Sequence, residues 1–247
     1  RIVLIFLFTP FLAFPQKAIP YQVGEYSAFD VSFGAIIVGH AELEIVEEKL
    51  IDSISIFHIV GKGKTAYFFD WFFKVRDVYE TFLDTSKLLP IKFIRDINEG
   101  PYSKKQNYFF HHSDSIVKHN DTTYKIPFNS QDMLSAFFYA RTFNKEEVKK
   151  TSSFFVPIFM DEENYFLEVS YLNNEVIETE FGKVDCMVFK PKMQEGRVFE
   201  DGEEMKIWIS DDKNHLLMKV ETKIWAGTIK AVLADYKELK FPLSIIQ

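Results

Sequence analysis

A single cysteine, Cys186, is present among the 247 residues, so no intramolecular disulfide can form. Glycine and proline are also few, with ten and nine residues, and this excludes a collagen-like or low-complexity chain. With 47% hydrophobic and 26% charged residues, the composition is typical of a globular domain. Because no covalent cross-link is available, a hydrophobic core must hold the fold, and the chain is long enough to bury one.

Positive charge is in deficit. The 29 lysines and arginines are outnumbered by 36 aspartates and glutamates, which gives a formal net charge of −7 and an isoelectric point of about 5.5. Nucleic acids and anionic lipid surfaces are recognised mainly through positive charge. The balance therefore disfavours both partners, and we expect no nucleic-acid partner.

Catalytic and metal-binding motifs are missing. The sequence contains no HExxH, CxxC, GxSxG or Walker spacing, and Cys186 lies in an apolar run where thiols are usually inert. His111 and His112 are adjacent, so on a strand they would point to opposite faces. Accordingly, no catalytic residue, metal site or cofactor is predicted.

Carboxylates gather in three short segments that also contain turn-forming residues: 161–164, 200–204 and 210–212. We interpret them as solvated hairpin loops. A calcium site, or a glycosidase pair supplied by two loops, stays open because such carboxylates need only be close in space.

No apolar run approaches the roughly 20 residues that a membrane-spanning helix requires. The first residues, RIVLIFLFTPFLAFPQ, combine one basic residue with a short apolar core interrupted by Pro10 and Pro15. This pattern is typical of a secretory signal peptide. We therefore interpret residues 1–16 as a signal peptide with a truncated start, and expect residues 17–247 in the periplasm or outside the cell, without a transmembrane segment.

Most of the chain alternates apolar and polar residues with a period of two. Two such runs, 25–34 and 36–48, are joined at Phe33-Gly34-Ala35, which predicts a β-hairpin. Similar short runs with turn residues between them continue to residue 239. The pattern predicts a mainly β fold, an antiparallel bent sheet that is barrel-like or sandwich-like.

One segment has helical spacing. Residues 129–144 carry apolar side chains at intervals of three and four, and Asn129 or Ser130 can cap the helix. We expect one or two short helices packed on the sheet. We expect residues 17–247 to form a single β-rich domain. If this domain has two halves, the charged residues that follow the helix predict that they meet near 144–152.

The stretch TAYFFDWFFKV, residues 65–75, places aromatic residues at six of the seven positions from 67 to 73. As a short helix it would be apolar on nearly every side, so we expect it to be buried as a core plug. A ligand-pocket wall is the second interpretation. A membrane contact is the third, because only Lys64 and Lys74 supply positive charge nearby.

The pocket interpretation assigns ligand contacts to two aromatic-rich segments. The predicted ligand-binding residues are Phe68, Phe69, Trp71, Phe72, Phe137 and Arg141. Asp77 and Asp132 are predicted instead as buried polar partners that fix the helix onto the sheet.

Four segments in succession, FFDWFFKVRDVYETFLD, LLPIKFIRDINEG, SQDMLSAFFYAR and KIWISDDKNHLLMKVETKIWAGTIKAVL, resemble the exported bacterial proteins of domain-of-unknown-function family 3108. The resemblance covers nearly the whole chain after the leader. It implies a secreted or periplasmic, mostly antiparallel β protein with no established activity, catalytic residue or cofactor.

Three hypotheses for function follow. The first is a non-enzymatic envelope protein whose bent sheet holds an apolar or lipid-like ligand. The 27 phenylalanines and the lack of catalytic motifs favour it. The second is a packed structural module that binds an envelope protein partner. The third is a carboxylate-dependent hydrolase of envelope polymers. An apolar cavity would favour the first, a filled core with an exposed apolar patch the second, and two converging carboxylates the third.

Overall fold

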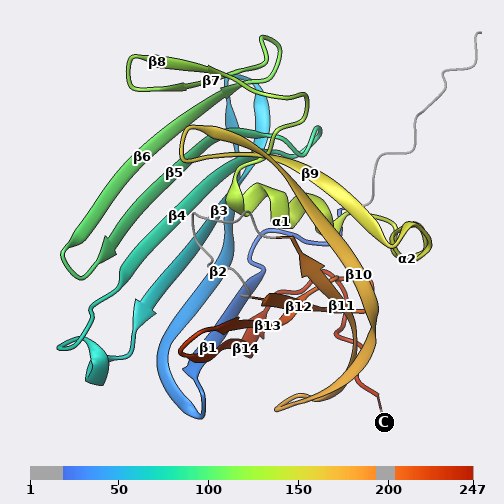
Figure 1. Ribbon diagram of the computed structural model, residues 1–247. Helices are drawn as coiled ribbons and strands as arrows, with labels where there is room; N and C mark the ends of the chain where they lie inside the picture. Colours follow the sequence, from blue (N-terminus) through green and yellow to red (C-terminus); the bar gives the residue numbers. More distant parts are fainter. Residues whose placement is uncertain (1–18, 193–203, 247) are drawn as a thin grey trace, which may run out of the picture.

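The computed structural model describes residues 19–192 and 204–246. The predicted signal peptide, residues 1–16, and most of the acidic segment 200–204 lie outside the described residues. Within the described part, fourteen strands form one antiparallel sheet in the order β8-β7-β6-β5-β4-β3-β2-β1-β14-β13-β12-β11-β10-β9 (Figure 1). The predicted mainly β, antiparallel fold class is confirmed.

The strands of the first half are β1 (Tyr26–Phe33), β2 (Ile36–Ile51), β3 (Ile54–Thr65), β4 (Arg76–Asp84), β5 (Pro90–Glu99), β6 (Tyr102–His111), β7 (Ile116–His119) and β8 (Thr122–Lys125). Those of the second half are β9 (Ser153–Met160), β10 (Glu163–Thr179), β11 (Gly182–Pro191), β12 (Glu204–Ser210), β13 (Leu217–Ile224) and β14 (Gly227–Lys237). The short helices are η1 (Tyr67–Phe69), α1 (Met133–Arg141) and α2 (Lys145–Thr151).

The sheet bends around α1, which lies between its two halves (Figure 1). Phe138 of α1 packs with buried residues of β2, β3 and β4, whereas Ala136 packs against β9. At the far edge, Phe159 of β9 packs with residues of β5, β6 and β7. Asp161, in the β9–β10 turn, forms ion pairs of 2.9 Å with Arg95 and with Lys104. The two ends of the sheet thus approach each other, which gives the fold its barrel-like form.

Helix α1 is capped by Asp132 rather than by Asn129 or Ser130. The Asp132 carboxylate accepts hydrogen bonds of 2.8 Å from the Leu134 and Ser135 backbone N–H groups, and its own N–H donates to Ser135 Oγ. Thr81 of β4 donates to the same carboxylate at 2.5 Å. Burial raises the Asp132 pKa to about 6, because desolvation disfavours the charged form. This residue therefore joins the start of the helix to the sheet.

The hairpin predicted at residues 33–35 is confirmed: β1 ends at Phe33, β2 begins at Ile36, and Gly34 has a φ of 60°. The charged segment after α1 folds into α2, which Asn144 caps by accepting from the Glu146 and Glu147 N–H groups. Both α-helices therefore lie in the connection between β8 and β9.

Candidate functional site

An apolar cavity of about 270 Å³ lies between α1, α2 and strands β9 to β12. Both strands and helices contribute side chains to its lining. From the strands the lining residues are Phe154, Val156, Ile158, Leu167, Val169, Met187, Phe189, Pro191, Ile207 and Ile209. The helical region contributes Met133, Ala136, Phe137, Ala140, Arg141, Phe143, Lys145 and Val148, and the loop before β13 contributes His215.

Backbone periodicity explains why this cavity is apolar. The strand residues come as pairs two positions apart, such as Val156 with Ile158 and Leu167 with Val169, so they share one face of the sheet. On α1, positions 133, 136, 137 and 140 have the spacing of a single helix face. Positions 136 and 140 are both alanines, and these small side chains leave open the space that larger side chains would fill.

The cavity becomes polar at one end. It shares Arg141, Phe143, Lys145, Val148, Phe154 and His215 with a larger, open cleft of about 1390 Å³. The remainder of that cleft is lined by the N-terminal segment, α2 and the C-terminal residues 240–244. An apolar chamber therefore adjoins a polar, water-accessible cleft.

Arg141 forms a buried ion pair beside the cavity. Its Nη1 and Nη2 groups donate to the two carboxylate oxygens of Glu25 at 2.5 and 3.1 Å, and the two side chains are 2% and 4% exposed. The guanidinium also donates to the Asn214 carbonyl and lies over the rings of Tyr21 and Phe138. This arginine lines the cavity, but its charge is neutralised within the protein.

His215 and Lys145 are the polar groups where cavity and cleft meet. His215 Nδ1 lies 2.6 Å from the Arg141 carbonyl oxygen. Because a carbonyl oxygen only accepts hydrogen bonds, Nδ1 carries the proton, and in the neutral ring Nε2 is then an acceptor. Lys145 Nζ contacts Asp211 at 2.8 Å, and Lys149 contacts the same carboxylate at 2.7 Å. These groups could face the polar end of a ligand.

Asp211 lies in one of the three acidic segments, and the prediction of a solvated loop is wrong for it. Its side chain is 7% exposed, and it accepts hydrogen bonds from Lys145, Lys149 and Asn174. Burial alone would raise the Asp211 pKa, but these hydrogen bonds and the lysine charges hold it well below its usual range. Asp211 therefore ties α2 to the sheet.

The aromatic stretch is not a core plug. Phe68, Trp71 and Phe72 are 75%, 79% and 78% exposed, and Phe69 is half-buried. The stretch forms the β3–β4 loop at the rim of the sheet, where none of the described residues covers these rings. Asp70 accepts from Arg76 at 2.5 Å and from Thr65, which folds the loop back on itself.

Among the predicted ligand-binding residues, Phe137 and Arg141 line the cavity, whereas the four from the β3–β4 loop do not. Asp77 is buried in β4 and accepts from the Asn98 N–H of the neighbouring β5 at 2.9 Å. The sequence reasoning missed the strand half of the cavity. Its signal is present as the apolar pairs two residues apart in β9 to β12.

Within the part of the chain that the structure describes, no group of three or more histidine, cysteine, aspartate or glutamate side chains is arranged to hold a metal ion. No described helix is both long and apolar enough to cross a bilayer. Cys186 is fully buried, and desolvation raises its thiol pKa to about 12.

The family model "Protein of unknown function (DUF3108)" matches residues 28–234, from β1 to β14. The chain belongs to the DUF3108 family. The match extends over both halves of the sheet and includes the helices and strands that line the cavity. No curated protein matches this DUF3108 chain.

The DUF3108 chain is also similar to a solved structure, a beta-barrel-like protein of domain of unknown function DUF1849 from Brucella abortus. The TM-score is 0.54 at 8% sequence identity, and the alignment covers 89% of this chain and 99% of the other. At this identity the likeness concerns the fold alone.

Proposed function

We propose that this protein is a non-enzymatic, exported component of the bacterial cell envelope that holds an apolar or lipid-like ligand. The observation that carries the proposal is the apolar cavity of about 270 Å³ between α1 and strands β9 to β12. Apolar cavities of about 150 Å³ already hold a guest the size of benzene. The leader-like residues 1–16 support the exported location.

The shape of the site favours an amphipathic ligand. An apolar chain would occupy the cavity, where it contacts Phe154, Leu167 and Met187, while its polar end would reach the cleft. Lys145 and His215 lie at that junction and supply a positive charge and a ring nitrogen. A small number of polar groups at one end of an apolar pocket is the usual pattern of small-molecule sites.

The proposal is tested by titrating the protein with an environment-sensitive fluorescent fatty acid. Ala140→Phe places a ring in the cavity from the helix face that lines it, so probe binding should fall at least about tenfold. Ala140→Ser is the matched control, because it leaves the volume open and should bind as the wild type does. Equal probe affinity of Ala140→Phe and the wild type, with both folded, would contradict the proposal.

A further inference from the structure

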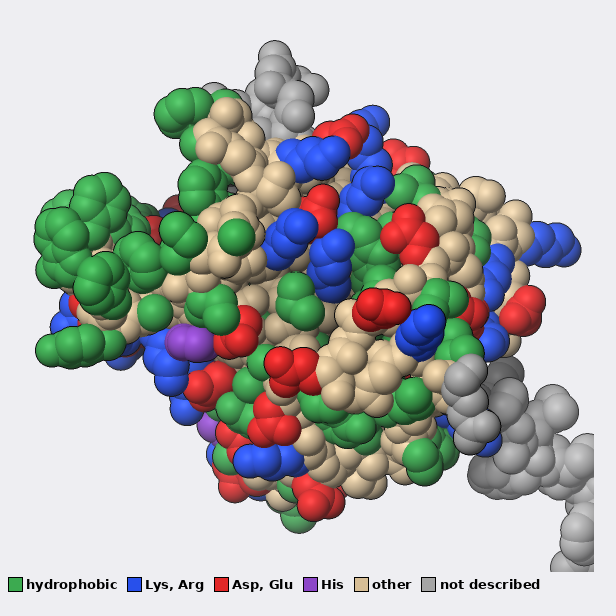
Figure 2. Space-filling model, turned by 90° about the horizontal axis from the view of Figure 1, so that it is seen from below, with side chains coloured by type: hydrophobic (Ala, Val, Ile, Leu, Met, Phe, Trp, Pro, Cys, Tyr) green, Lys and Arg blue, Asp and Glu red, His purple; other side chains and the backbone are tan. Residues whose placement is uncertain are grey.

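Four neighbouring turns at one end of the sheet form a continuous hydrophobic tip. We use "aromatic tip" for the exposed residues Phe33, Ile36, Ile37, Tyr67, Phe68, Trp71, Phe72, Phe73, Tyr102, Trp225 and Ile229. They come from the β1–β2, β3–β4, β5–β6 and β13–β14 turns and from the strand ends beside them. Figure 2 shows a protruding group of hydrophobic side chains at the left of the molecule, where Figure 1 places the β3–β4 loop.

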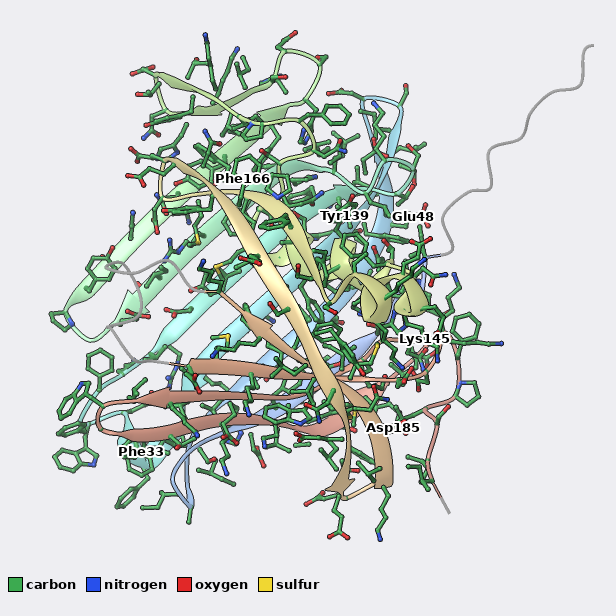
Figure 3. The ribbon with its side chains drawn as sticks, turned by 45° about the vertical axis from the view of Figure 1, so that its right-hand side comes forward. Phe33, Glu48, Tyr139, Lys145, Phe166 and Asp185 are labelled. Atoms are coloured by element: carbon green, nitrogen blue, oxygen red, sulfur yellow. The ribbon has the colours of Figure 1, made fainter. Side chains whose placement is uncertain are left out.

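Hydrogen bonds and ring packing join these turns. The Gly34 N–H donates to the Thr228 carbonyl at 3.0 Å, and the Gly100 N–H donates to the Lys74 carbonyl at 2.8 Å. A Cβ added at Gly100 would lie 2.9 Å from the ring of Phe73, so this ring rests directly on the neighbouring turn. In Figure 3, several rings gather around the labelled Phe33. The aromatic tip is therefore one surface held by the sheet rather than four separate loops.

The exposure is too large for isolated surface residues. Tyr67 is 93% exposed and Trp225 is 85% exposed, while three further rings of the β3–β4 loop exceed 70%. Contiguous exposed apolar patches mark protein or membrane contacts. Tryptophan and tyrosine, which dominate the outermost positions, are the residues enriched at the boundary between a bilayer and water.

Charge around the aromatic tip identifies the class of partner. Residues 62–76 contain four basic residues and one acidic residue, in a chain whose formal charge is −7. In the described structure, the exposed Lys62, Lys74 and Lys223 form no ion pair. Lysines beside inserted rings complement lipid phosphates, and a convex tip offers no groove for a peptide.

We propose that the aromatic tip docks this protein onto a phospholipid bilayer, with the rings of the β3–β4 loop and Trp225 inserted at the headgroup level and the neighbouring lysines facing the phosphates. The tip is distinct from the cavity, since none of its residues lines that cavity. Docking would be peripheral and reversible, because only side chains of short turns enter the interface.

Flotation with vesicles of phosphatidylethanolamine and phosphatidylglycerol tests this proposal. The double variant Trp71→Ser/Phe72→Ser removes two rings that are mostly in water, so the fold should persist while vesicle affinity falls about tenfold or more. Phe166→Ser is the matched control: Phe166 is 65% exposed but is labelled in the upper part of Figure 3, away from Phe33. The cavity variant Ala140→Phe should float as the wild type does, which separates docking from ligand binding.

With Trp225 replaced by phenylalanine, Trp71 and the buried Trp208 remain as emitters. Vesicles should shift this tryptophan emission to shorter wavelength, since the inserted Trp71 indole leaves water while Trp208 stays in the core. Three results would overturn the proposal. The wild type could stay in the soluble fraction, the double variant could float like the wild type, or the aromatic tip could mediate self-association without vesicle binding.

Discussion

Replacing Arg141 by methionine removes the cation of the buried ion pair and leaves the Glu25 carboxylate, 4% exposed, without its partner. Methionine keeps much of the apolar volume among the rings of Tyr21 and Phe138, so the change isolates the charge and its hydrogen bonds. The Asn214 carbonyl also loses its donor.

The expected loss is large, because an uncompensated buried charge costs about 3 to 5 kcal/mol. For a chain of this length, each kcal/mol lowers Tm by about 2 to 4 °C, so Tm should fall by about 6 to 20 °C. Urea unfolding followed by tryptophan fluorescence, together with calorimetry, measures the change. The double variant Glu25→Gln/Arg141→Met removes both charges and should recover about 2 kcal/mol or more of the loss.

A cost below about 1 kcal/mol for Arg141→Met would refute this account of the ion pair. So would strict additivity of the Glu25→Gln and Arg141→Met effects, because a buried pair in contact must show coupling.

Three other predictions concern buried polar groups. Folding raises the Asp132 pKa to about 6, so the stability contributed by the neutral carboxyl is complete below pH 3.8 and is lost as pH rises through about 6. Asp132→Asn should therefore stabilise the protein by up to about 3 kcal/mol at pH 7.5 and by little at pH 4. Equal stability changes at the two pH values would contradict this prediction. The lowered Asp211 pKa contributes stability that is present above pH 3.8 and is lost on acidification. Asp211→Asn should therefore speed amide hydrogen exchange across residues 145–151 at neutral pH. Unchanged exchange in that segment would contradict the prediction. Cys186 should react with a thiol reagent only after unfolding; modification of the folded protein at the rate of a free thiol would show that its burial is wrong.

The sequence predicts the strands well because their alternation reflects burial on one face, a local signal. It predicts the hairpin at Gly34 for the same reason. The predicted start of α1 is wrong by a few residues: Asn129 has a φ of 59°, which is not a capping conformation, and Gln131 instead forms a bridge with Ile158 of β9. The position at which the helix starts thus depends on a partner strand that is distant in sequence.

The β3–β4 loop shows a different limit. An apolar run is buried only if another layer covers it, and the sequence does not say that β3 ends at the open rim of the sheet. The helical spacing singles out Arg141, but its ion-pair partner Glu25 lies 116 positions away, and no local pattern links the two residues. Likewise, the apolar pairs of β9 to β12 indicate an inward face without showing that this face and α1 leave a cavity.

The central claim, that the cavity holds an apolar ligand, is tested most directly by native mass spectrometry of residues 17–247 purified from a bacterial periplasm. We predict a discrete additional mass that mild organic extraction removes and that is absent from Ala140→Phe but present in Ala140→Ser. A wild-type protein with only the mass of its own chain, which also fails to take up added fatty acid after extraction, would contradict the account.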